Sequence, residues 1–137
     1  MGSWDTTAFA NDTAADWLAE LVESNGWEMI DEAFSSILAA GDDFIEAQQG
    51  EEGIAAAEVV AWINGQPGST AEDTDALEQW IDEQEFESDT SRAKRARKVV
   101  DRIFNEPSEL RDQWEDEGEF EEWRKELTSL KDRLAGS

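Results

Sequence analysis

Apolar residues recur along most of this chain at intervals of three and four positions, the spacing of one face of an α-helix. Glycine or proline follows most of these stretches and ends them. Alternation of apolar and polar residues, which is typical of strands, never extends beyond a few positions. The pattern predicts an all-α fold, a single compact multi-helix domain over residues 1–137 with about six or seven helices and no significant sheet.

Two aromatic residues lie at the centres of their apolar stripes, and we expect both to be core residues: Trp17 and Phe34. The stripe of the second expected helix, residues 27–40, comprises Ile30, Ala33, Phe34, Ile37 and Leu38. The third helix is expected from about residue 51 to residue 64. Between them, residues 42–50 are expected to form a connector with Phe44 and Ile45 tucked beneath it.

The first ten residues are too polar and too short for a helix. We expect residues 1–10 to form a non-helical N-terminal anchor, with Trp4 and Phe9 folded back onto the core. Asn11, Asp12 or Thr13 can then cap the first helix, because a short side-chain oxygen accepts from the free amides of the first turn.

The opening of the chain also carries a specific motif. It matches Met-Gly-x-Trp-Gly-x-Gly-x-Phe-x-Asn-Asp followed by an Ala, an Asp and an aromatic, at Met1, Gly2, Trp4, Phe9, Asn11, Asp12, Ala14, Asp16 and Trp17. In this respect the chain resembles a family of short microbial proteins, domain of unknown function 4259. Asp5 and Thr7 replace two glycines of the motif. The resemblance implies a mostly helical domain and no assigned activity.

Charge is distributed unevenly along the chain. Residues 1–91 contain 23 Asp and Glu and no Lys or Arg, whereas residues 92–137 contain all 11 basic residues and 12 acids. The net charge of −24 therefore divides into −23 and −1. Residues 89–105 form the sole basic helix, and its polar side presents a candidate interaction face of Lys94, Arg95, Lys98 and Arg102.

Two interpretations of this face remain open. It either contacts another molecule, or it complements the acidic part of its own chain. Phosphate groups would suit the four cations, but the remaining surface is strongly negative and disfavours nucleic acid. An unknown protein partner is possible, together with weak, non-specific association of cations.

A small domain usually carries a net charge of about 2–8 in magnitude. The value of −24 indicates adaptation to a salty environment, since the Debye length shrinks to about 3 Å at 1 M salt and self-repulsion becomes tolerable. The competing interpretation is a surface selected to bind a cationic partner.

The absence of several residue types limits the catalytic and binding chemistry that the chain can support. The chain has no His, Cys or Tyr and no glycine-rich phosphate loop, so we expect no catalytic residues, no cofactor and no enzyme activity. A calcium loop beginning at Asp73 fails, because its sixth position is Glu78 and its twelfth is Gln84, and we expect no metal site. No apolar run is long enough to cross a membrane, and a cytoplasmic location is expected.

These observations favour a non-catalytic, highly acidic, salt-adapted helical protein that acts by protein–protein interaction. One alternative is a neutralising, immunity-type or nucleic-acid-mimicking protein that captures a basic partner. The other is a helical domain that binds a small ligand in a pocket.

Overall fold

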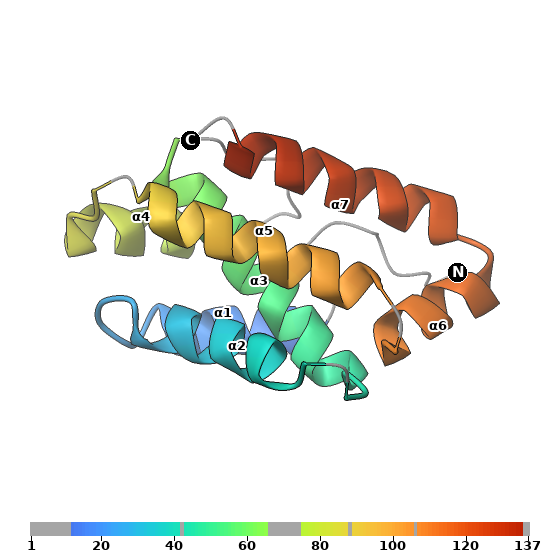
Figure 1. The fold of residues 1–137 in the computed structure, drawn as a ribbon. Coiled ribbons are helices and arrows are strands. Elements are labelled where there is room, and N and C mark those ends of the chain that lie inside the picture. The colour runs from blue at the N-terminus through green and yellow to red at the C-terminus, as the bar shows by residue number, and fades with distance from the viewer. Residues whose placement is uncertain (1–11, 42, 66–74, 88, 106, 136–137) are drawn as a thin grey trace.

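The computed structural model describes residues 12–41, 43–65, 75–87, 89–105 and 107–135. These ranges contain seven helices and no strand (Figure 1), which confirms the predicted all-α fold. Ile45 and Ser108 form one isolated bridge. The helices are α1 (Asp12–Leu21), α2 (Glu28–Ala39), α3 (Ala47–Ile63), α4 (Asp75–Gln84), α5 (Thr90–Phe104), α6 (Glu109–Glu117) and α7 (Phe120–Ala135). The predicted anchor, residues 1–10, lies outside the described residues.

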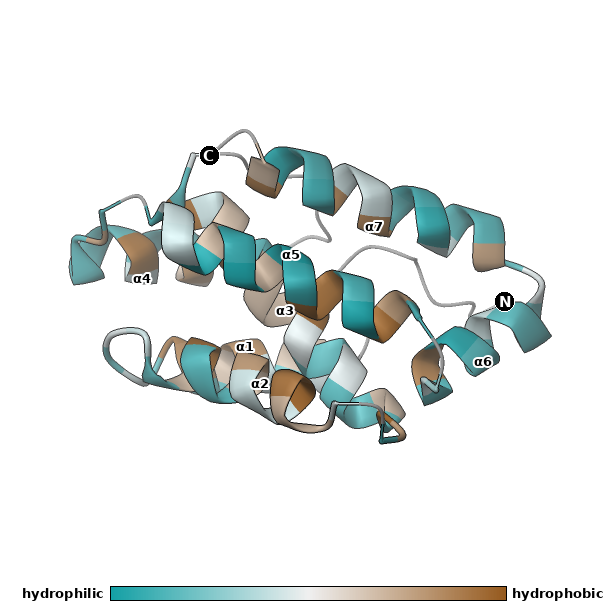
Figure 2. Cartoon of the chain, in the orientation of Figure 1, coloured by the Kyte–Doolittle hydropathy of each residue, from teal (hydrophilic) through white to brown (hydrophobic). Residues whose placement is uncertain are grey.

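The centre of the fold is α3, against which α1, α2, α5, α6 and α7 all pack. Its residues from Gly53 to Ala61 are all buried, which suits a helix that is apolar almost all round. The outer helices are amphipathic instead, and Figure 2 shows hydrophobic positions interspersed with hydrophilic ones along α5 and α7. None of the helices in the described ranges is long and apolar enough to cross a lipid bilayer.

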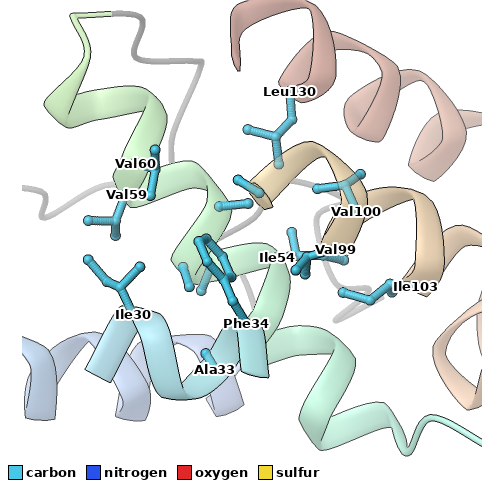
Figure 3. Packing of buried hydrophobic residues seen from close by; sticks show 14 of the residues in the cluster. Ile30, Ala33, Phe34, Ile54, Val59, Val60, Val99, Val100, Ile103 and Leu130 are labelled. Carbon is cyan, nitrogen blue, oxygen red and sulfur yellow. The ribbon is translucent and has the colours of Figure 1, made fainter. Parts of the chain in front are cut away.

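Side chains from four helices meet in the core around Phe34, which is fully buried (Figure 3). Trp17 on α1 is only 5% exposed, so the core positions predicted for both aromatic residues are confirmed. The other labelled members are Ile30 and Ala33 from α2, Ile54, Val59 and Val60 from α3, Val99, Val100 and Ile103 from α5, and Leu130 from α7.

Two glycines allow α3 and α5 to approach closely. A Cβ atom on Gly53 would lie 2.9 Å from Ile103 Cδ1, 3.1 Å from Ile37 Cγ1 and 3.3 Å from Val99 Cγ1. A Cβ atom on Gly50 would lie 3.3 Å from Ile103 Cγ2 on α5 and 3.2 Å from Leu110 Cδ2 on α6. These glycines are therefore packing residues within a continuous helix.

The predicted boundaries of this region were wrong in part. Helix α3 begins at Ala47, inside the expected connector, because Gln49 Oε1 accepts from the Glu46 N–H at 3.0 Å and Glu109 Oε1 accepts from the Ala47 N–H at 2.9 Å. Two of its free N–H groups are thereby satisfied.

Two side chains expected to be buried are instead exposed. Phe44 is 52% exposed because its neighbour Ile45, in an extended segment, takes the inward position and is fully buried. Leu38 is 36% exposed because it lies at the edge of the α2 stripe, one position beyond the buried Ile37.

We predict that Gly53→Leu lowers the free energy of unfolding by about 2–3 kcal/mol, because the site has no room for even one added carbon. Leucine is a good helix former, so helix propensity cannot cause the loss. The matched control Gln48→Leu places the same side chain at an exposed position of α3 and should change stability by less than about 0.5 kcal/mol. Equal effects of the two substitutions in chemical denaturation would contradict the close approach.

Candidate functional site

The four residues of the predicted interaction face on α5 have different surroundings in the structure. Lys94 and Lys98 are exposed, and neither makes a hydrogen bond or ion pair with any described residue. Arg95 instead lies against α2, where its guanidinium donates to Ser35 Oγ at 2.8 Å and lies 3.7 Å from Asp31 Oδ1. Arg95 thus contacts an acidic residue of its own chain, and the interaction face itself stays a prediction.

The remaining member of the face, Arg102, binds backbone carbonyl groups. It donates to Gly41 O at 2.7 Å and Asp43 O at 2.6 Å in the α2–α3 loop. It also donates to Asn105 O at 2.9 Å and Pro107 O at 3.2 Å beyond the end of α5. Arg102 therefore braces two connecting segments against each other.

The ion pairs made by Arg92 on α5 were not predicted. Arg92 forms a bidentate pair with Asp31, with Nε 3.0 Å from Oδ1 and Nη2 2.7 Å from Oδ2. It also pairs with Asp89 at 2.7 Å and covers the ring of Trp27 at 4.2 Å. The Asp89-x-x-Arg92 spacing was a local signal for half of this arrangement, whereas Asp31 lies 61 residues away in the sequence.

Asp89 is also the N-cap of α5, since its Oδ1 accepts from the Arg92 backbone N–H at 2.9 Å. This hydrogen bond is the largest cause that lowers the pKa of Asp89 below its usual value of 3.8, and the ion pair with the Arg92 side chain adds to it against desolvation. The pKa of Arg92 is raised, first by its hydrogen bond to Asp31.

A buried ion pair joins the centre of the fold to its last helix. Glu58 on α3 is 3% exposed, and both of its carboxylate oxygens accept from Arg133 on α7, at 2.5 and 3.0 Å. Sequence reasoning missed this pair, although the presence of an acid inside the apolar run of residues 53–63 was a signal that a cation must meet it.

Two of the family-motif residues, Asp16 and Trp17, line an open groove between α1 and α3. Trp4, Phe9 and Asn11 lie outside the described residues, and Asp12 begins α1. The groove measures about 630 Å³ and is lined by Thr13, Asp16, Trp17, Ala19, Glu20, Gln48 and Glu52. No three Asp or Glu residues in the described ranges are arranged to hold a metal ion.

A second, smaller cavity of about 110 Å³ lies between α5 and α7. Its floor is apolar, whereas Arg124 and Lys131 line its polar side. Both cations are already paired, Arg124 with Glu121 at 2.8 Å and Lys131 with Asp101. This cavity therefore offers no uncommitted charge to a ligand.

Comparison with known proteins gives one match. The family model described as domain of unknown function (DUF4259) matches residues 2–126. No curated protein and no solved structure is significantly similar to the chain.

Acid should remove the contribution of Asp89 to stability. A carboxyl group whose pKa is lowered on folding stabilises the protein above its unfolded pKa, and this contribution disappears as pH falls through the lower folded value. We predict that Asp89→Ala lowers the free energy of unfolding by about 1–2 kcal/mol at pH 7. The deficit should shrink as pH falls below 3.8.

The matched control is Ser108→Ala, which removes the N-cap of α6, where Ser108 Oγ accepts from the Arg111 N–H at 3.4 Å. A hydroxyl does not titrate in this range, so its deficit should be independent of pH between 7 and about 2.5. A deficit of Asp89→Ala that is the same at both ends of this range would contradict the assignment.

Proposed function

The chain belongs to the family described as domain of unknown function (DUF4259), and we propose that it is a non-catalytic protein that acts by protein–protein interaction. Its acidic surface is adapted to concentrated salt and suits a partner that carries positive charge. The single observation that carries this proposal is the array of exposed acids on segments that contain no cation of their own.

These acids lie on α1, α2, α4 and the segments that follow them. The exposed members are Asp16, Glu20, Glu23, Glu28, Glu32, Asp43, Glu46, Glu78, Asp82, Glu83, Glu85 and Glu87. The cations of residues 92–137 reach the acidic part of the chain at Asp31, Glu58 and Asp89, where they form ion pairs. Each of these three side chains is at least partly buried, so the pairs do not neutralise the outer surface.

Such a surface repels itself at low ionic strength. In about 1 M salt the Debye length falls to about 3 Å, and the repulsion between neighbouring carboxylates is largely screened. The same carboxylates present a potential that is complementary to a basic protein and that would repel an acidic one. The same screening weakens the attraction to a basic partner, so in about 1 M salt charge alone holds such a partner weakly.

A second candidate function is the binding of a small ligand in the groove between α1 and α3. The observation that favours it is the composition of the groove, whose carboxylates Asp16, Glu20 and Glu52 lie beside the indole of Trp17. A small cationic ligand would find negative charge there.

We predict that the melting temperature rises by about 5 °C or more between 0.1 and 2 M potassium chloride and then levels off, because screening relieves repulsion. Sodium chloride should act alike, since screening depends on ionic strength. A control variant with Glu20, Glu23, Glu83 and Glu87 changed to Gln should melt higher at 0.1 M and respond less to salt. A melting temperature that is flat or falls with salt would refute the salt adaptation of this surface.

A further inference from the structure

We propose that Phe44, held at the corner between α2 and α3, is an apolar anchor that docks into a hydrophobic socket on a positively charged protein partner. This inference rests on the proposed function, because it specifies where that interaction takes place and which chemistry it uses. The corner comprises residues 41 and 43–46 and lies at the lower right of Figure 1.

The first observation is exposure. Phe44 is 52% exposed and Leu38, in the last turn of α2, is 36% exposed, and these are the exposed large hydrophobic side chains among the described residues. Aromatic side chains are enriched at protein interfaces because they bury a large area at a low cost in conformational entropy.

The second observation is that the corner is braced. Arg102 donates to the carbonyl oxygens of Gly41 and Asp43, immediately before Phe44. On the other side of Phe44, the Ile45 N–H donates to Pro107 O at 3.2 Å, and Ile45 O accepts from the Glu109 N–H at 2.9 Å. The ring is thus presented on a backbone fixed on both sides, which reduces the entropy lost on binding.

The third observation is the charge around the ring. Asp43 and Glu46 flank Phe44 and are both exposed. Arg102 also lies at this corner, and its four backbone carbonyl partners do not cancel its positive charge, but the two acids outnumber this one cation. An apolar side chain within a negative rim is complementary to an apolar socket within a positive rim.

In concentrated salt, the proposed interaction needs the ring of Phe44 in addition to charge. At about 1 M salt the attraction between exposed charges is nearly screened, so complementary charge alone holds a partner weakly. Burial of an apolar side chain does not depend on this attraction and persists in concentrated salt. The ring of Phe44 therefore supplies the affinity that charge attraction loses in concentrated salt.

The test uses two synthetic helical peptides of equal positive charge, one with a stripe of leucines opposite its arginines and one with serines in their place. Their binding to the whole protein is followed by fluorescence anisotropy at 0.15 and 1 M potassium chloride. We expect the leucine peptide to bind about tenfold tighter than the serine peptide at 1 M salt, and Phe44→Ser to abolish this difference.

Three control variants make the result specific. Phe44→Trp should keep the tight binding because it keeps an exposed aromatic ring. Glu46→Gln should weaken binding several-fold at 0.15 M, whereas Glu83→Gln on the distant α4 should change it much less. Thermal melting of each variant checks that the fold is retained.

Two results would overturn the inference. If the leucine peptide binds equally well to Phe44→Ser, the acidic surface acts without an anchor, and the proposed function stands while this inference fails. If sedimentation shows that Phe44→Ser converts a dimer into a monomer, the socket belongs to a second copy of the chain. Failure of both peptides to bind at either salt concentration would instead contradict the cationic partner of the proposed function.

Discussion

The buried charge of Glu58 is the constraint on which the arrangement of this protein depends. A carboxylate that is 3% exposed at the centre of α3 would be strongly destabilising without a cation. Residues 1–91 contain no Lys or Arg, so the cation must come from the last third of the chain. Arg133 supplies it from the last turn of α7, 75 residues away, where a positive charge also suits the helix C-terminus.

The same division of charge governs the rest of the molecule. Helix α5 brings Arg92 and Arg95 to Asp31 on α2, and Arg102 holds the α2–α3 loop by its carbonyl groups. Four cations of the C-terminal part, those of Arg92, Arg95, Arg102 and Arg133, thus fasten it to the acidic part. The surplus of acids on the outer surface is the basis of the proposed salt dependence and of the proposed cationic partner.

Local pattern predicted the helices well, because the spacing of apolar residues and the capping signals are properties of adjacent positions. It failed at Gly50, which was expected to end the connector of residues 42–50 but lies inside α3 and packs against Leu110. It also failed to pair Arg92 with Asp31 and Glu58 with Arg133, since these contacts join positions 61 and 75 residues apart. In a chain rich in acids, periodicity shows that a charge is buried but does not identify its partner.

A double-mutant cycle on Glu58 and Arg133 tests this account most directly. Glu58→Met and Arg133→Met should each lower the free energy of unfolding by about 3 kcal/mol, since each removes the oppositely charged partner of the other residue at a site that is largely buried. The double variant should lose much less than the sum of the two, and the coupling should persist in 2 M potassium chloride because buried pairs are screened weakly. Additive losses, or a coupling that disappears in salt, would contradict the dependence of the fold on this pair.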